Sequence, residues 1–131
     1  RQMCIRDSFL AFDLGAESGR AMLAELRDGR MHLSEVHRFP NRAQLVNGRL
    51  CWDPFALFHE MKSGLARAVA TCGGGSGGGS PILSAGIDTW GVDFGLIDRN
   101  GDLLGPVVHY RDARTDGVFE RAFRIVPREE I

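Results

Sequence analysis

The stretch FLAFDLGAESGR, at residues 9–20, sets the architecture of the first part of the chain. Residues 9–12 are apolar or small, which predicts a short buried strand that ends at Asp13. Two glycines then bracket a tight turn at residues 15–19, and the chain becomes apolar again at residues 21–26. We therefore expect a β-hairpin in which the second strand returns beside the first.

The polar residues of this turn have the chemistry of a phosphate-binding loop. Glycine lets the backbone approach a polyphosphate closely, and successive N–H groups can point at its oxygens. Ser18 adds a hydroxyl donor, Arg20 adds a permanent cation, and Asp13 is placed to hold magnesium directly or through water. An ordinary hairpin loop, with glycine where a positive φ is needed, is the alternative interpretation of the same residues.

Composition limits the class of protein. The chain has 131 residues, of which 44% are hydrophobic and 25% charged, with a net charge of -1. These values are ordinary for a globular domain, and without a basic block or a long apolar run they favour neither nucleic acid nor membrane as a partner. The three cysteines, Cys4, Cys51 and Cys72, are widely spaced, which indicates free thiols in a reducing cytoplasm.

Both ends of the sequence indicate a piece of a longer protein. Residues 1–8, RQMCIRDS, have neither strand nor helix periodicity, and we interpret them as a non-native or misread leader. The last residues, IVPREEI, end in a charged stretch without a closing element. We therefore expect residues 9–131 to be the N-terminal part of a larger chain.

The middle of the chain predicts a third strand followed by a helix. The turn signal Asp28-Gly29 precedes a half-polar edge strand at residues 31–39, and residues 40–48 read as a loop that ends in an Asn47-Gly48 turn. The pair Asp53-Pro54 then predicts a helix start that reaches nearly to Cys72. Helical spacing predicts one core-facing stripe made of Phe55, Phe58, Met61, Leu65 and Val69.

A glycine-serine stretch, GGGSGGGS at residues 73–80, follows that helix. We interpret it as a flexible loop within a domain, because a strand-like run follows at once and the helix needs a sheet to cover its apolar face. A domain boundary and an engineered insert are the alternatives. A helix flanked by strands predicts an α/β fold.

Residues 82–116, ILSAGIDTWGVDFGLIDRNGDLLGPVVHYRDARTD, are the second informative stretch. They predict strands at residues 82–87, 92–97 and 103–108, with an Asn100-Gly101 turn. The strand ends carry the residue types that hold a polyol, namely charged hydrogen-bonding groups and a flat ring that covers its C–H face. Those residues are Trp90, Tyr110, Arg111 and Asp112. The alternative makes Trp90 a core residue and residues 112–114 a surface ion pair that caps a helix.

The motifs GIDTWGVDFGLID, HYRDARTDG and DLGAESGR together closely resemble those of the FGGY carbohydrate kinase family, over roughly residues 9–123. The resemblance implies an α/β fold of the ribonuclease-H-like type, as in actin and hexokinase, present here as an incomplete N-terminal domain. In this family two such domains enclose ATP and the sugar. The expected partners are therefore small molecules, and the oligomeric state is left open.

The resemblance also implies a reaction and its residues. Within the family the motifs best match members that transfer the ATP γ-phosphate to O1 of L-rhamnulose with Mg2+ in L-rhamnose catabolism. Gly91 is then expected to line the sugar site, with Trp90 and Asp112 beside it. The catalytic base is expected downstream of Ile131, so this chain alone would be inactive. Asp13 is expected near the metal, and the ATP-binding residues are Asp13, Ala16, Glu17, Ser18, Gly19 and Arg20.

Three other readings remain open. The first is another sugar kinase of the same family, acting on a sugar such as fuculose, xylulose or glycerol. The second is a non-catalytic nucleotide- or sugar-binding fragment. The third is a designed or fused scaffold, which the GGGSGGGS stretch favours.

Overall fold

The computed structural model describes residues 7–73 and 81–130. It divides into two compact units. The first unit contains residues 7–42 and 53–92, and the second contains residues 43–52 and 93–130. The expected leader, apart from Asp7 and Ser8, and the glycine-serine loop, apart from Gly73, lie outside the described residues.

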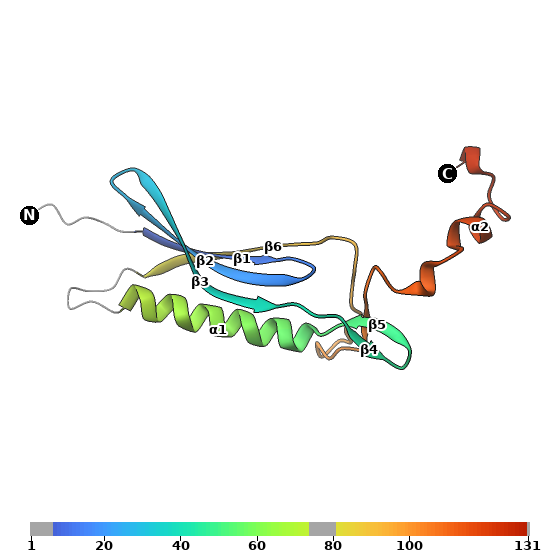
Figure 1. The fold of residues 1–131 in the computed structure, drawn as a ribbon, viewed down its shortest axis with the longest axis horizontal. Helices are drawn as coiled ribbons and strands as arrows, with labels where there is room; N and C mark the ends of the chain where they lie inside the picture. The colour runs from blue at the N-terminus through green and yellow to red at the C-terminus, as the bar shows by residue number, and fades with distance from the viewer. Residues whose placement is uncertain (1–6, 74–80, 131) are drawn as a thin grey trace, which may run out of the picture. The chain divides into compact units, whose positions relative to one another are not determined.

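The first unit is built on a four-stranded sheet with the order β3-β2-β1-β6 (Figure 1). Strands β1 (Asp7–Leu14), β2 (Ser18–Arg27) and β3 (Arg30–Pro40) form an antiparallel meander, which confirms the predicted hairpin and the predicted edge strand. Strand β6 (Ile82–Thr89) pairs with β1 in parallel. Asp7 and Ser8 belong to β1, so this strand begins two residues before the apolar run that predicted it.

Two-residue turns close the hairpins where the sequence predicts them. Asp28 and Gly29 have φ values of 52° and 73°, and Asn47 and Gly48 have values of 49° and 77°. Positive φ at both central residues is typical of the type I′ turn, whose twist matches that of the strands that it joins. Both turns are therefore fixed by local sequence.

Helix α1 (Pro54–Gly73) lies along one face of this sheet (Figure 1). Asp53 caps its first turn, because the Ala56 backbone N–H donates to the Asp53 Oδ1 at 2.9 Å. The helix therefore begins where the Asp-Pro pair predicts, and it ends one residue beyond Cys72.

The prediction of which residues form the buried face of α1 is largely wrong. Of the five stripe residues only Met61 packs against the core of the first unit, whereas Phe55, Phe58, Leu65 and Val69 are 73%, 59%, 43% and 55% exposed. The side of the helix that meets the sheet consists of small and medium residues, because the two backbones approach each other closely. These residues are Leu57, Met61, Gly64, Ala68 and Cys72.

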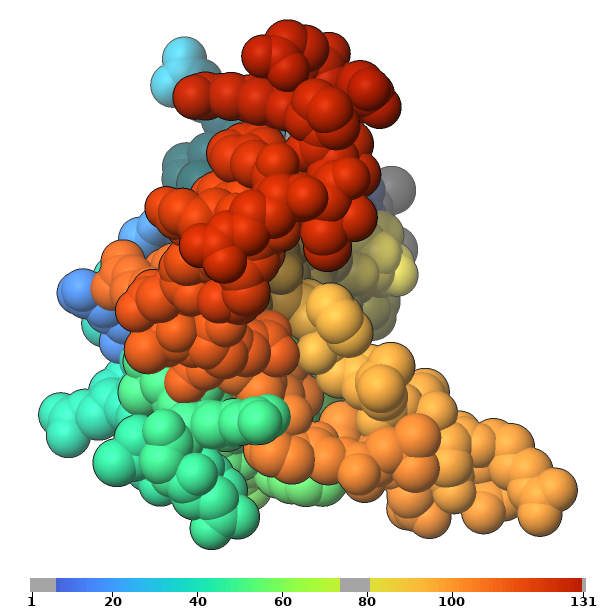
Figure 2. Space-filling model, turned by 90° about the vertical axis from the view of Figure 1, so that its right-hand side faces the viewer, coloured from blue at the N-terminus to red at the C-terminus, as the bar shows by residue number. Residues whose placement is uncertain are grey.

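The second unit contains a small sheet with the order β4-β5-β7. Its strands are β4 (Gln44–Val46), β5 (Arg49–Trp52) and β7 (Val107–Val108), so the region predicted as a loop at residues 40–48 contains a short strand. Helices η1 (Ala113–Thr115), α2 (Val118–Ala122) and η2 (Arg128–Glu130) follow. Residues 113–130, orange-red to red in Figure 2, include no buried side chain.

Two of the predicted strands are wrong or shortened. Residues 92–97 form no strand, and within residues 103–108 only β7 and a single bridge between Leu103 and Ile97 are present. The predicted turn at residues 100–101 is present, because the Asp98 Oδ1 accepts the backbone N–H groups of Asn100 and Asp102 at 2.8 and 2.9 Å. Beside this turn the Leu104 backbone N–H donates to the Leu96 carbonyl at 2.9 Å.

Gly64 tests the contact between α1 and the sheet. A Cβ atom at this position would lie 2.8 Å from the Ala21 Cβ and 3.2 Å from the Phe12 ring. We expect Gly64→Leu to lower the free energy of unfolding by about 1–3 kcal/mol or more, because the new side chain would overlap neighbours that cannot move apart easily. Ala66→Leu, which places the same side chain on the exposed side of α1, is the matched control and should be nearly neutral. Chemical denaturation measures both, and equal effects would contradict the close contact.

Candidate functional site

The tip of the β1–β2 hairpin is held in one shape by hydrogen bonds to its carbonyl groups. The Gly15 backbone N–H donates to the Ser18 carbonyl at 3.0 Å, and the Asn41 backbone N–H donates to the Glu17 carbonyl at 2.9 Å. The Asn41 side chain, which is 6% exposed, donates from its Nδ2 to the Gly15 carbonyl at 2.9 Å. Three carbonyl oxygens of the expected phosphate loop are thus bonded within the first unit.

The two glycines of this loop have steric roles. Neither Gly15 nor Gly19 has a positive φ, so the alternative that explained them by turn conformation is wrong. A Cβ at Gly19 would lie 2.2 Å from the Phe39 ring, which is itself buried. Gly19 is therefore required because β3 places an aromatic ring directly against the loop.

Four charged residues form a row across the sheet next to this loop. In strand register Asp13 pairs with Asp88 on one side and with Arg20 on the other, and Arg20 pairs with Arg38. Because Phe12 and Ala21 face α1, the alternation of side chains places Asp13 and Arg20 on the opposite face of the sheet. The row therefore has two carboxylates on β6 and β1 and two guanidinium groups on β2 and β3.

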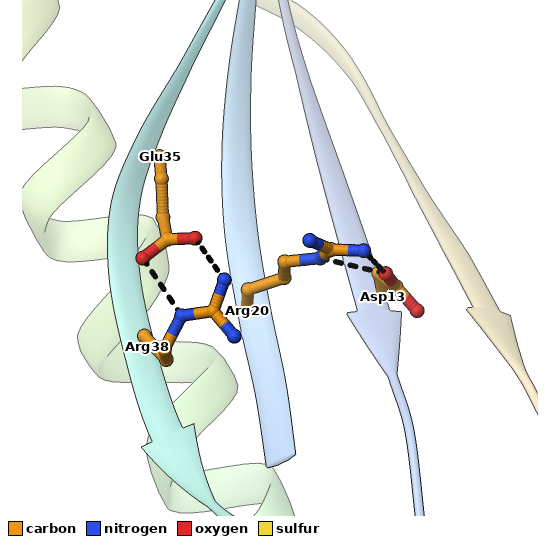
Figure 3. Close-up of polar contacts among 4 residues, drawn as sticks. All are labelled: Asp13, Arg20, Glu35 and Arg38. Atoms are coloured by element: carbon orange, nitrogen blue, oxygen red, sulfur yellow. Dashed lines mark hydrogen bonds and ion pairs between the residues drawn. The ribbon is translucent and has the colours of Figure 1, made fainter.

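Asp13 and Arg20 form an ion pair within this row (Figure 3). The Arg20 Nε donates to the Asp13 Oδ2 at 2.7 Å, and the Arg20 Nη2 lies 2.5 Å from the same oxygen. Both side chains are a little under half exposed, so water and solutes reach them. The pair brings the expected metal-binding carboxylate and the expected phosphate-binding cation into direct contact.

The residues fit a magnesium ion that is bound mainly by phosphate and water. Within the described part of the chain there is no group of three or more His, Cys, Asp or Glu side chains arranged to hold a metal. Mg2+ commonly takes only one or two protein carboxylates and completes its octahedron with water and substrate phosphates. Asp13 could supply such a carboxylate, and the chemistry supplied by the ion would be neutralisation of phosphate charge.

Trp90 and Gly91 follow β6 at the same edge of the sheet as the hairpin tip, because β6 is parallel to β1. Trp90 is partly buried and packs against the core of the first unit, which agrees with the alternative interpretation that made it a core residue. Gly91 is exposed, and an added Cβ would meet nothing within 4 Å. Packing within the described residues therefore does not explain a glycine at this position.

Asp112 belongs to the second unit, where it is 7% exposed. Its Oδ2 accepts the Leu50 backbone N–H at 2.7 Å, and its Oδ1 accepts the Arg114 backbone N–H at 3.0 Å. The bond from Leu50 is the largest of several that hold the pKa of the Asp112 carboxyl below its usual range. Asp112 caps η1 as its alternative interpretation stated, but through backbone N–H groups in a buried place rather than as a surface ion pair.

An aromatic cluster surrounds Asp93 in the second unit. The rings of Trp52 and His109 are stacked with their centroids 3.9 Å apart, and both residues are buried. The Asp93 Oδ2 accepts the Trp52 Nε1–H at 2.5 Å and the Tyr110 backbone N–H at 3.2 Å. Sequence reasoning singled out Tyr110 but not Trp52, whose only signal was an aromatic residue just before a helix cap.

The surroundings of His109 in this cluster disfavour its charged form and lower its pKa. The Arg111 backbone N–H donates to the His109 Nδ1 at 2.9 Å, so that nitrogen carries no proton. Burial is the largest cause of a lowered pKa of His109, the charge of Arg111 lowers it further, and Asp93 opposes the shift. Proton uptake at this ring nitrogen would break the bond from Arg111.

Comparison with known proteins found strong sequence relatives and no matching family model. The chain is 43% identical over 122 residues to the rhamnulokinase of Oceanobacillus iheyensis, covering 93% of this chain and 24% of that protein. The chain is 39% identical over 127 residues to the rhamnulokinase of Bacteroides thetaiotaomicron, covering 97% of this chain and 25% of that protein. The chain thus spans about a quarter of the length of these relatives.

Solved structures agree on the fold. The xylulose kinase of Rhodospirillum rubrum matches with a TM-score of 0.71 at 20% identity, over 94% of this chain and 25% of that structure. The gluconate kinase of Lactobacillus acidophilus matches with a TM-score of 0.62 at 13% identity, over 91% and 24%. The resemblance to carbohydrate kinases and the α/β fold predicted from the motifs are both confirmed. No helix among the described residues is long and apolar enough to cross a membrane.

Asn41 tests how the loop is held. We expect Asn41→Ala to lower the free energy of unfolding by about 1–3 kcal/mol, because the Gly15 carbonyl would lose its partner inside the protein. Hydrogen exchange at residues 15–18 should also become faster. Asn100→Ala, at an exposed turn, is the matched control and should leave exchange in the loop unchanged. Unchanged exchange in the Asn41 variant would show that the backbone bonds alone hold the loop.

His109 predicts a pH dependence of stability. A histidine pKa that is lower in the folded than in the unfolded state favours folding above the unfolded value near 6.5, and this contribution is lost as pH falls. The free energy of unfolding should therefore decrease between pH 7 and pH 5, by at most about 1.4 kcal/mol per pH unit for one proton. Chemical denaturation at both pH values measures it. His109→Gln should show a smaller decrease, and an equal decrease would assign the pH dependence to other groups.

Proposed function

We propose that this chain forms the phosphate-binding region and part of the sugar-binding region of an ATP-dependent kinase. The kinase would convert L-rhamnulose to L-rhamnulose 1-phosphate. The proposal is supported by the similarity of more than nine tenths of this chain to part of the rhamnulokinases. The other three quarters of the relatives' length would carry the remaining functions. The cytoplasm, where ATP and the sugar are available, is the proposed location.

One arrangement supports this proposal more than any other. The hairpin tip at residues 15–18 and the residues after β6, Trp90 and Gly91, lie at the same edge of one sheet. A kinase needs a phosphate donor and an acceptor hydroxyl close together and in line, and an edge that gathers a phosphate-type loop and an open glycine meets that need.

The proposed roles of the residues follow from their chemistry. Arg20 and the Ser18 hydroxyl would bind phosphate oxygens, with the backbone of residues 16–19 around them. Asp13 would hold Mg2+ directly or through water, and the ion would neutralise phosphate charge. Gly91 would leave room for the sugar, and Trp90 and Asp112 are the weaker candidates for sugar contact. A carboxylate outside this chain would accept the proton of the sugar hydroxyl.

Another sugar specificity is the second candidate, because the two solved structures reported above are named for other substrates, xylulose and gluconate. The rhamnulokinases are favoured because they match at about 40% identity, whereas these two structures match at 20% and 13%. A binding fragment without catalysis remains the alternative for the isolated chain.

A chimera tests the reaction. This chain would replace the matching segment of the Oceanobacillus iheyensis protein, and the product would be assayed for sugar-dependent ADP release. We expect turnover with L-rhamnulose in preference to L-fuculose, D-xylulose and glycerol. A folded chimera that releases ADP only with one of the other sugars would replace the proposed substrate, and one inactive with all four would contradict the enzymatic proposal.

Gly91 tests the sugar site within the same chimera. Gly91→Leu should abolish measurable turnover, that is, lower it by at least about a hundredfold, because the new side chain would fill the space of the substrate. ATP binding should stay intact. Gly105→Leu is the matched control, because Gly105 is also exposed with nothing within 4 Å of an added Cβ. Normal turnover in the Gly91 variant would remove this residue from the site.

A further inference from the structure

Arg38 occupies a position that its sequence context did not single out. It lies on β3 directly opposite Arg20 on β2, so the two guanidinium groups start from neighbouring positions on the same face of the sheet. Like charges placed directly opposite each other are unfavourable in a sheet. Each arginine is compensated by its own carboxylate, Arg20 by Asp13 and Arg38 by Glu35 (Figure 3).

A β-bulge makes the second pair possible. Residues three apart on a regular strand point to opposite faces, so Glu35 and Arg38 would not meet. The register between β2 and β3 shifts by one residue. On β2, Ala21 and Met22 are adjacent, but their partners on β3 are His37 and Glu35, so Val36 is the extra residue. The bulge reverses the alternation and brings Glu35 to the side of Arg38.

The Glu35–Arg38 contact uses both arms of the guanidinium group. The Arg38 Nε donates to the Glu35 Oε1 at 3.0 Å, and the Nη2 donates to the Oε2 at 2.6 Å. A guanidinium fork binds phosphate oxygens with the same geometry as it binds a carboxylate. Half of the Arg38 side chain is exposed, so an incoming anion can reach it.

The charges of the four residues in Figure 3 influence one another. These residues are Asp13, Arg20, Glu35 and Arg38. Glu35 raises the pKa of Arg38 mainly through its hydrogen bond, and Asp13 raises it further. In the same way Arg38 lowers the pKa of Glu35 mainly through its hydrogen bond, and Arg20 adds to that effect. A polyanion or cation that binds one member of the set therefore changes the charge balance felt by the others.

We propose that Arg38 is a second polyphosphate-binding cation beside Arg20, and that Glu35 holds it in place until the anion arrives. Residues 38–41 run directly beside the hairpin tip, since Gly19 pairs with Phe39 and Ser18 with Pro40. The polyphosphate would exchange with Glu35 for the Arg38 fork. This inference rests on the proposed function, in which the same loop binds the phosphates of a nucleotide.

The test compares two substitutions that break the same ion pair. Arg38→Gln should weaken the binding of inorganic tripolyphosphate to this chain by about five- to tenfold, because a bidentate anion contact is lost. Glu35→Gln should strengthen it by about two- to fivefold, because the competing carboxylate is gone. Titration calorimetry at low salt, without sugar, measures both constants. A merely structural ion pair would move both constants in the same direction, and that result would overturn the proposal.

Arg27→Gln is the matched control. Arg27 also pairs with a glutamate, Glu25, but at the far end of β2, nine residues and about 30 Å from Ser18. It should leave the tripolyphosphate constant unchanged, and a decrease equal to that of Arg38→Gln would show non-specific attraction and overturn the proposal. Arg38→Lys, which keeps the charge and loses the fork, should give an intermediate constant if Arg38→Gln does not fold, and wild-type affinity in that variant would likewise overturn it.

Further arms separate this inference from the proposed function. The binding constant of ATP should change in the Arg38 and Glu35 variants in the same way as that of tripolyphosphate. If only ATP binding changed, the contact would be with the nucleoside rather than with the phosphates, and the inference would be overturned. Variant effects on anion binding together with an inactive chimera would retain Arg38 as an anion site and reject the kinase reaction. An active chimera with tripolyphosphate constants that no variant moves would reject only the role of Arg38.

Discussion

The in-register pairing of β1 with strands on both of its sides determines where Asp13, Asp88 and Arg20 lie. Because Asp13 pairs with Asp88 and with Arg20, the carboxylates and the first guanidinium group share one face of the sheet. Slipping β1 by one residue would turn Asp13 toward α1 and expose Phe12 and Leu14 instead. The core contact with α1 and the charge row on the other face are therefore two consequences of one register.

Local signals in the sequence predicted the elements that local chemistry fixes. The type I′ turns at residues 28–29 and 47–48 and the Asp53 cap each depend on residues that are neighbours in the chain. The buried face of α1 was not predictable in the same way. Apolar spacing selects Phe58 and Leu65, but the helix approaches the sheet through Gly64 and Ala68, whose small size matters only once the sheet is in place.

The site shows the same division. Asp13 and Arg20 could be found from the sequence because a hairpin of known length brings them together. Arg38 and Asn41 could not, because their positions depend on the pairing of β3 with β2 and on a bulge at Val36 that no local pattern marks. Sequence spacing alone would have placed Glu35 and Arg38 on opposite faces of the strand.

The parallel pairing of β6 with β1 has a consequence for the order in which the first unit assembles. Strands β1, β2 and β3 meet through short turns, whereas β6 reaches β1 only after the whole of α1 and the stretch that follows it. Closing such a long segment costs more conformational entropy than closing a hairpin, and contacts that are distant in sequence form slowly. We expect the antiparallel meander to form first and β6 to dock last. The end of the sheet that carries both the hairpin tip and Gly91 would then exist only after the slowest folding step.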